Sequence, residues 1–93
     1  MSKQKFDSIW DAIEDTPEEA ENMKLRSNLM TALKSHLARA GISQAEVAKL
    51  LGVTQPRVSD LMRGKINLFG FDTLVNMAAA AGLHLEIRVL ESA

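Results

Sequence analysis

Residues 41–65, GISQAEVAKLLGVTQPRVSDLMRGK, constrain the fold more than any other part of the chain. They read as two short helices joined at Gly52, a residue that accepts the positive φ needed for a tight turn. Ser43 followed by Glu46 is a capping box, which predicts that the first helix begins there and runs to Leu51. The chain must therefore pack two helices against each other within 25 residues.

The second helix of this pair is predicted to begin after Thr54 and to end at Gly64, with Pro56 tolerated in its first turn. Ala48 is small enough for the closest approach of the two helices. The apolar residues expected to hold the helices together are Val53, Val58 and Leu61. The outer face of the second helix is left polar, with Gln55, Arg57, Ser59, Asp60 and Arg63.

Helical patterns flank this pair on both sides. Thr16 as N-cap and Pro17 at the first helical position open a long helix that Gly41 is expected to close. Its core-facing stripe is predicted to be Leu25, Leu29, Leu33 and Leu37. After a loop at residues 65–70, residues 71–81 are predicted to form a fourth helix.

The C-terminal segment LHLEIRVLE has a different period, because apolar and polar residues alternate as in a half-buried β-strand. Its apolar positions are Leu83, Leu85, Ile87 and Val89. A single strand leaves its backbone groups unpaired. Two arrangements are open: pairing with the same strand of a second copy across a two-fold axis, which we favour, or packing on the helices with a free edge.

These patterns predict a mainly α fold, a bundle of about five helices with one C-terminal β-strand paired across a dimer. Residues 1–17 form an acidic N-terminal lead, either a short helix or a partner-binding arm. Residues 18–82 form the helical domain, and residues 83–93 the dimerisation strand. A chain of 93 residues is long enough for one such domain.

The net charge of -1 conceals a segregation of charge along the chain. Residues 1–22 carry seven acidic and two basic side chains, whereas residues 23–40 carry four basic and no acidic ones. Residues 41–66 carry four basic and two acidic side chains. The near-neutral total argues weakly against nucleic-acid binding, but a basic middle between acidic ends does not, because charge clustered on one face is what counts.

Other classes of site are disfavoured. The absence of cysteine excludes disulfides and cysteine-ligated zinc, and His36 and His84 fall in different elements, so we expect no metal or cofactor. No Ser-His-Asp, Cys-His or phosphate-cradling pattern is present, which makes an enzyme the least expected class. Without a recognisable signal peptide or membrane span, a cytoplasmic, nucleoid-associated protein is expected.

Residues 41–65 resemble the helix-turn-helix of lambda-repressor-like regulators, the XRE family. The resemblance lies in the Gln-Ala-Glu-x-Ala opening, the glycine turn, the Thr-Gln start of the second helix and the Arg-Gly-Lys exit. It implies a lambda-repressor-like DNA-binding domain at residues 18–82, whose second helix enters the major groove of double-stranded DNA. For a dimer, the operator is then an inverted repeat.

This resemblance gives the polar face its roles. Gln55 is expected to pair with adenine and Arg57 with guanine, and Pro56 offers an apolar surface to a thymine methyl group. Ser59 and Asp60 lie one turn further along, and Asp60 has two open roles: accepting from cytosine, or orienting Arg57 or Arg63. The residues expected to contact phosphate are Gln44, Thr54, Arg63 and Lys65.

The flanks resemble a narrower group, the HigA antitoxins, through WDAIEDTPEEAENMKLRS and LFGFDTLVNMAAAAGLHLEI. Such proteins neutralise a RelE/HigB-like ribonuclease toxin and repress their own operon. Phe6, Ile9 and Trp10 lie in the acidic lead and either anchor such a partner or pack on the chain's own core. The alternatives to a repressor and antitoxin are a stand-alone XRE repressor and a module that binds only proteins.

Overall fold

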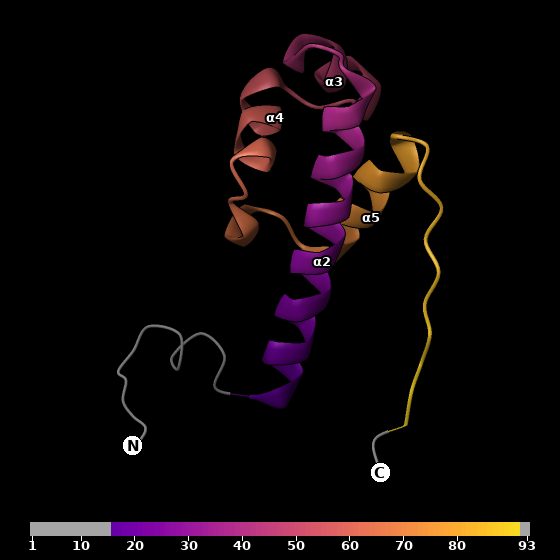
Figure 1. The fold of residues 1–93 in the computed structure, drawn as a ribbon. Coiled ribbons are helices and arrows are strands. Elements are labelled where there is room, and N and C mark those ends of the chain that lie inside the picture. The colour runs from indigo at the N-terminus through magenta and orange to yellow at the C-terminus, as the bar shows by residue number, and fades with distance from the viewer. Residues whose placement is uncertain (1–15, 92–93) are drawn as a thin grey trace.

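The structure, a computed structural model, describes residues 16–91 (Figure 1). Its elements are α2 (Pro17–Ala40), α3 (Gln44–Leu51), α4 (Gln55–Met62), the 3-10 turn η1 (Ile66–Leu68) and α5 (Phe71–Ala80). The long helix α2 is the axis of the molecule, with α4 on one side and α5 on the other, and α3 covers its C-terminal end (Figure 1). None of these helices is long and apolar enough to cross a membrane.

Helix α2 begins and ends where its capping residues predict. The Thr16 hydroxyl accepts from the Glu19 backbone N–H at 3.0 Å, and Pro17 occupies the first turn. Gly41 ends the helix with a φ of 70°. Its buried residues are Leu29, Met30, Leu33 and Leu37. Leu25, predicted to belong to the same stripe, is 45% exposed because the N-terminal half of α2 extends beyond the other helices (Figure 1).

The core lies where α2 meets α4, α5 and the loop between them. Its largest fully buried side chains are Phe69, Leu33, Leu61, Leu74 and Val58. Among the described residues no polar or charged side chain is buried, so the core is entirely apolar. The His36 imidazole, outside this core, donates from Nε2 to the Ala81 carbonyl oxygen at 2.9 Å and ties α2 to the end of α5.

The predicted C-terminal β-strand is wrong, and so is the predicted number of helices. Residues 16–91 contain four α-helices and no strand, and residues 83–91 run extended beside α5 and α2 (Figure 1). The physical reason is that alternation predicts only an extended backbone with two distinct faces. A strand also needs a neighbour to complete its hydrogen-bond ladder, and the described part of the chain provides none.

The extended segment bounds an apolar groove of about 760 Å³ between itself, α2 and α5. The apolar part of its lining is Leu25, Leu29, Phe71 and Val75 on the helices, and Leu85, Ile87, Val89 and Leu90 on the segment. Ile87, Val89 and Leu90 are each at least 79% exposed. This is the largest concentration of exposed apolar side chains among residues 16–91.

Candidate nucleic-acid interface

Helices α3 and α4 form a pair whose ends are closed by local hydrogen bonds. The Ser43 hydroxyl accepts from the Glu46 N–H at 3.1 Å, and the Glu46 carboxylate accepts from the Ser43 N–H at 2.9 Å. Gly52, with a φ of 71°, reverses the chain so that the Val53 N–H donates to the Ala48 carbonyl at 3.0 Å. Both the predicted capping box and the predicted turn are confirmed.

The apolar side of α4 fixes how the helix is rotated. Val58 and Leu61 are fully buried against α2 and α3, and the Thr54 hydroxyl caps the helix by accepting from the Arg57 N–H at 3.3 Å. Because one side of α4 is held in the core, its other side faces out. Gln55 and Pro56 are exposed there, and the half-exposed side chains are Arg57, Ser59 and Asp60.

Arg57 does not extend freely from this face. Its guanidinium carbon lies 4.1 Å from the centroid of the Phe69 ring, a cation–π contact. The loop that carries Phe69 is hydrogen-bonded to α2 through Arg26. Arg26 Nη1 donates to the Ile66 and Phe69 carbonyl oxygens at 3.5 and 3.4 Å. The residue predicted to read guanine is thus positioned by Phe69, and Phe69 by Arg26.

Sequence reasoning missed both Phe69 and Arg26 as parts of this site. Phe69 stands six residues beyond the predicted exit arginine, in a segment expected to be a plain loop. Arg26 counted only as one cation of an acid-free run. An aromatic residue in a predicted loop is the one sequence signal for Phe69, which the structure shows to be fully buried, and no periodicity marks Arg26.

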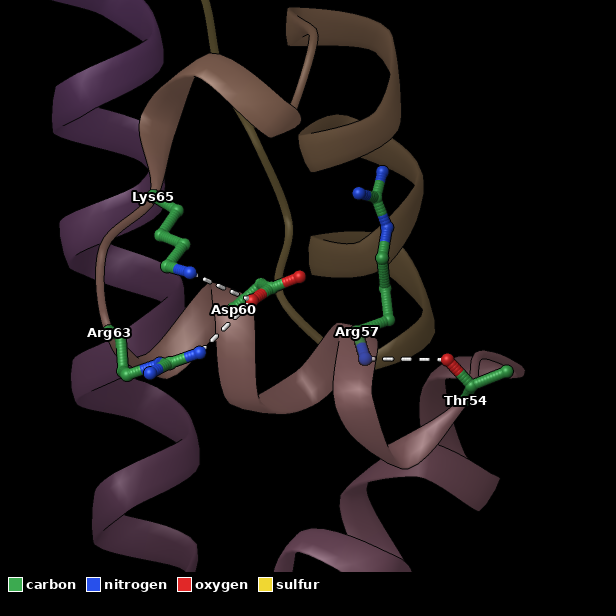
Figure 2. A network of polar contacts seen from close by, with 5 residues as sticks. All are labelled: Thr54, Arg57, Asp60, Arg63 and Lys65. Atoms are coloured by element: carbon green, nitrogen blue, oxygen red, sulfur yellow. Dashed lines mark hydrogen bonds and ion pairs between the residues drawn. The ribbon is translucent and has the colours of Figure 1, made fainter.

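The exit of α4 brings three charged side chains together (Figure 2). Asp60 Oδ1 lies 3.4 Å from Arg63 Nη2 and 3.6 Å from Lys65 Nζ. Gly64, with a φ of 74°, turns the backbone so that the Lys65 N–H donates to the Asp60 carbonyl at 3.1 Å. Of the contacts left open for Asp60, the structure contains the one with Arg63 and adds Lys65.

The nine residues predicted to bind DNA lie between the first residue of α3 and the exit of α4, eight of them at or after Thr54, and none of them is buried. Gln44 stands at the start of α3. The predicted partner anchors Phe6, Ile9 and Trp10 lie outside the described residues. No group of histidine, aspartate or glutamate within residues 16–91 has the arrangement to hold a metal ion.

A protein family and a solved structure are similar to this chain. The family described as helix-turn-helix domain matches residues 12–90. A solved structure described as an XRE family transcriptional regulator aligns with a TM-score of 0.73 and 32% sequence identity, over 80% of this chain and 83% of that one. No curated protein matches the chain.

Proposed function

The chain belongs to the helix-turn-helix domain family, and on that premise we propose that it is a homodimeric, sequence-specific repressor that also acts as an antitoxin. Family and structural match support the broader statement, a DNA-binding transcriptional regulator. The observation that carries the DNA-binding role is α4 itself. Its apolar side is fully buried while its opposite side presents polar and basic groups to solvent.

Base reading is assigned to the N-terminal half of α4. Gln55 pairs with adenine, Arg57 with guanine, and the exposed ring of Pro56 contacts a thymine methyl group. Backbone phosphates are held at both ends of the helix pair. The phosphate contacts are assigned to Gln44, Thr54, Arg63 and Lys65.

Homodimerisation is assigned to the apolar side chains of the C-terminal segment, without any strand. Leu85, Ile87 and Val89 are 41%, 79% and 87% exposed in one chain, and Leu83 is half-buried beside them. A second copy that covers this surface removes it from water. Two recognition helices about 34 Å apart then read an inverted repeat.

The DNA-binding role is tested by a gel shift on the region upstream of the protein's own gene, with Arg57→Ala and Gln55→Ala. Both variants are expected to lose operator binding while their melting temperature stays close to wild type. Arg39→Ala, which removes an exposed arginine from the last turn of α2, is the matched control and is expected to bind normally. A collapse of the melting temperature in Gln55→Ala would mean that α4 is a core helix and not a recognition helix.

The antitoxin role rests on the resemblance of the flanks and on the acidic, tryptophan-bearing lead, which suits a basic RelE/HigB-like ribonuclease. A chain lacking residues 1–15 keeps the Thr16 cap of α2 intact. It is expected to bind DNA normally and to bind the toxin encoded beside it more weakly. Unchanged toxin affinity would show that the acidic lead is not part of the toxin-binding site. A genome without a neighbouring toxin gene would favour the alternative, a stand-alone XRE repressor.

A further inference from the structure

One carboxylate interrupts the basic exit of α4. Asp60 is flanked by Arg57 before it and by Arg63 and Lys65 after it, on the side of the helix that faces away from the core. Its side chain is 26% exposed, whereas the side chains of Arg63 and Lys65 are 62% and 47% exposed. The carboxylate side chain is therefore less exposed to solvent than the two cations that it contacts.

Helix stability does not explain this carboxylate. Asp60 stands in the last turn of α4, where the helix macrodipole presents its negative end and an acidic side chain is unfavourable. Its two ion pairs are exposed, and exposed pairs contribute little to folding. Instead, the carboxylate at this position fixes where the side chains of Arg63 and Lys65 lie.

Backbone hydrogen bonds in the turn after α4 also fix the position of Lys65. The Gly64 N–H donates to the Leu61 carbonyl at 2.9 Å and the Lys65 N–H donates to the Asp60 carbonyl, which together fold Lys65 back over the helix end. Lys65 is thereby tied to Asp60 twice, once through the backbone and once through the side chain. Arg63 reaches the same carboxylate oxygen, Oδ1.

We infer that Asp60 is a specificity-determining residue: it holds Arg63 and Lys65 in place and lowers the affinity of the protein for DNA of the wrong sequence. This inference rests on the proposed DNA-binding function. Non-specific binding depends almost entirely on phosphate contacts, so a carboxylate among the phosphate-binding cations weakens it directly. Specific binding also gains base contacts from Gln55 and Arg57, and it benefits from cations that are already held at the correct place.

The variant Asp60→Asn keeps the shape of the side chain and removes its charge. A unit charge about 7 Å from a phosphate changes affinity roughly three- to tenfold when the effective dielectric constant lies between that of bulk water and that of a protein surface. We expect non-specific DNA to bind Asp60→Asn tighter by about that factor. The selected site is expected to change less than about twofold, because the gain in charge is offset by the loss of the two fixed cations. The specificity ratio falls accordingly.

The test measures binding by fluorescence anisotropy to two duplexes of equal length and composition. One is a site selected by the wild-type protein from a random duplex library, and the other is the same site scrambled. Glu18→Gln makes the same charge change in the first turn of α2, at the opposite end of the molecule from α4, and is expected to leave both affinities within about twofold. Asp60→Glu keeps the charge and is expected to retain weak binding to the scrambled duplex.

Equal tightening on both duplexes in Asp60→Asn would overturn the inference, because Asp60 would then be only a charge. Loss of binding to the selected duplex alone would also overturn it, and would assign Asp60 to base reading. The wild-type arm tests the proposed function separately. If the wild-type protein selects no sequence from the library, the DNA-reading role fails whatever Asp60 does.

Discussion

Residues 41–65 and residues 83–91 both carry regular apolar patterns, but their side chains end in opposite surroundings. In the first stretch Val58 and Leu61 are fully buried, and the helices end in capping hydrogen bonds to residues a few positions away. In the second, Ile87 and Val89 are 79% and 87% exposed. The first stretch completes the caps of its own helices and buries Val58 and Leu61, whereas the second leaves Ile87 and Val89 in water.

This difference indicates that the two regions contribute to two different equilibria, the folding of one chain and the proposed association of two chains. Burial in residues 41–65 contributes to the folding of one chain and holds α4 in place. Apolar surface in residues 83–91 contributes little to that folding, and in the proposed dimer its cover by a second chain contributes to association. Substitutions in the first region should therefore act on unfolding, and substitutions in the second on the oligomeric state.

The sharpest test of this contrast is the same change made in both regions. Leu61→Ala is expected to lower the free energy of unfolding by about 2–5 kcal/mol, because it leaves a cavity at a fully buried site. Leu85→Ala, at a site that is 41% exposed, is expected to cost about 1 kcal/mol or less in the monomer. Urea denaturation at a dilution where the protein is monomeric measures both. Equal losses of unfolding free energy in the two variants would contradict the contrast between the two regions.

The next largest effect is expected at the turn between α3 and α4. Gly52→Ala places a β-carbon on a backbone with a φ of 71°, which costs about 1–2 kcal/mol although the space around it is open. Gly52→Asn should lose less, since asparagine adopts this conformation more readily. Thermal unfolding of the two variants measures the order. A more stable Gly52→Ala would contradict the role given to the turn.

A smaller effect is expected at the start of α3. Ser43→Ala removes the oxygen that accepts from the Glu46 N–H, and such caps contribute about 1 kcal/mol. Ser43→Asn preserves an acceptor and is the matched control, expected to stay within about 0.5 kcal/mol of wild type. Chemical denaturation followed by circular dichroism measures both variants. A loss in Ser43→Asn as large as that in Ser43→Ala would show that the hydroxyl oxygen is not what matters.

The smallest effect on unfolding is expected in the C-terminal segment. Ile87→Ser should change the monomer's free energy of unfolding by no more than about 0.5 kcal/mol, because the side chain is already in water. Sedimentation should nevertheless show a weaker dimer. Leu50→Ser, at an exposed leucine of α3, is the control that should leave association unchanged. If Ile87→Ser dimerised as strongly as wild type, residues 83–91 would not be the dimerisation surface.

The fold follows from the sequence wherever a signal is completed nearby in the chain. Thr16, Ser43 and Gly52 each act through atoms three to five residues away, so pattern alone predicts the helices they bound. The predicted strand is wrong because its completion depends on a neighbour that the pattern does not describe. The prediction of Leu25 in the core is also wrong, because periodicity shows which face of a helix is apolar, but not how far the neighbouring helices extend.

The candidate interface divides in the same way. The outward position of Gln55 and Arg57 follows from the apolar spacing of α4. The stacking of Arg57 on Phe69 joins residues twelve positions apart through a turn, and the contact of Arg26 with the Phe69 carbonyl spans 43 positions. Contacts of that range depend on the packed arrangement of three elements, which no local spacing encodes.

The length of α2 has a consequence for how the protein meets DNA. Its 24 residues span about 36 Å, with Glu18, Glu19 and Glu21 near its first turn and α4 beside its C-terminal half (Figure 1). These three glutamates concentrate negative charge near the end of α2 that lies away from α4. In the proposed binding mode, a duplex repels this acidic end, so the molecule experiences a torque that turns α4 toward the DNA before any contact forms. Fewer collisions are wasted on wrong orientations than for an evenly charged particle.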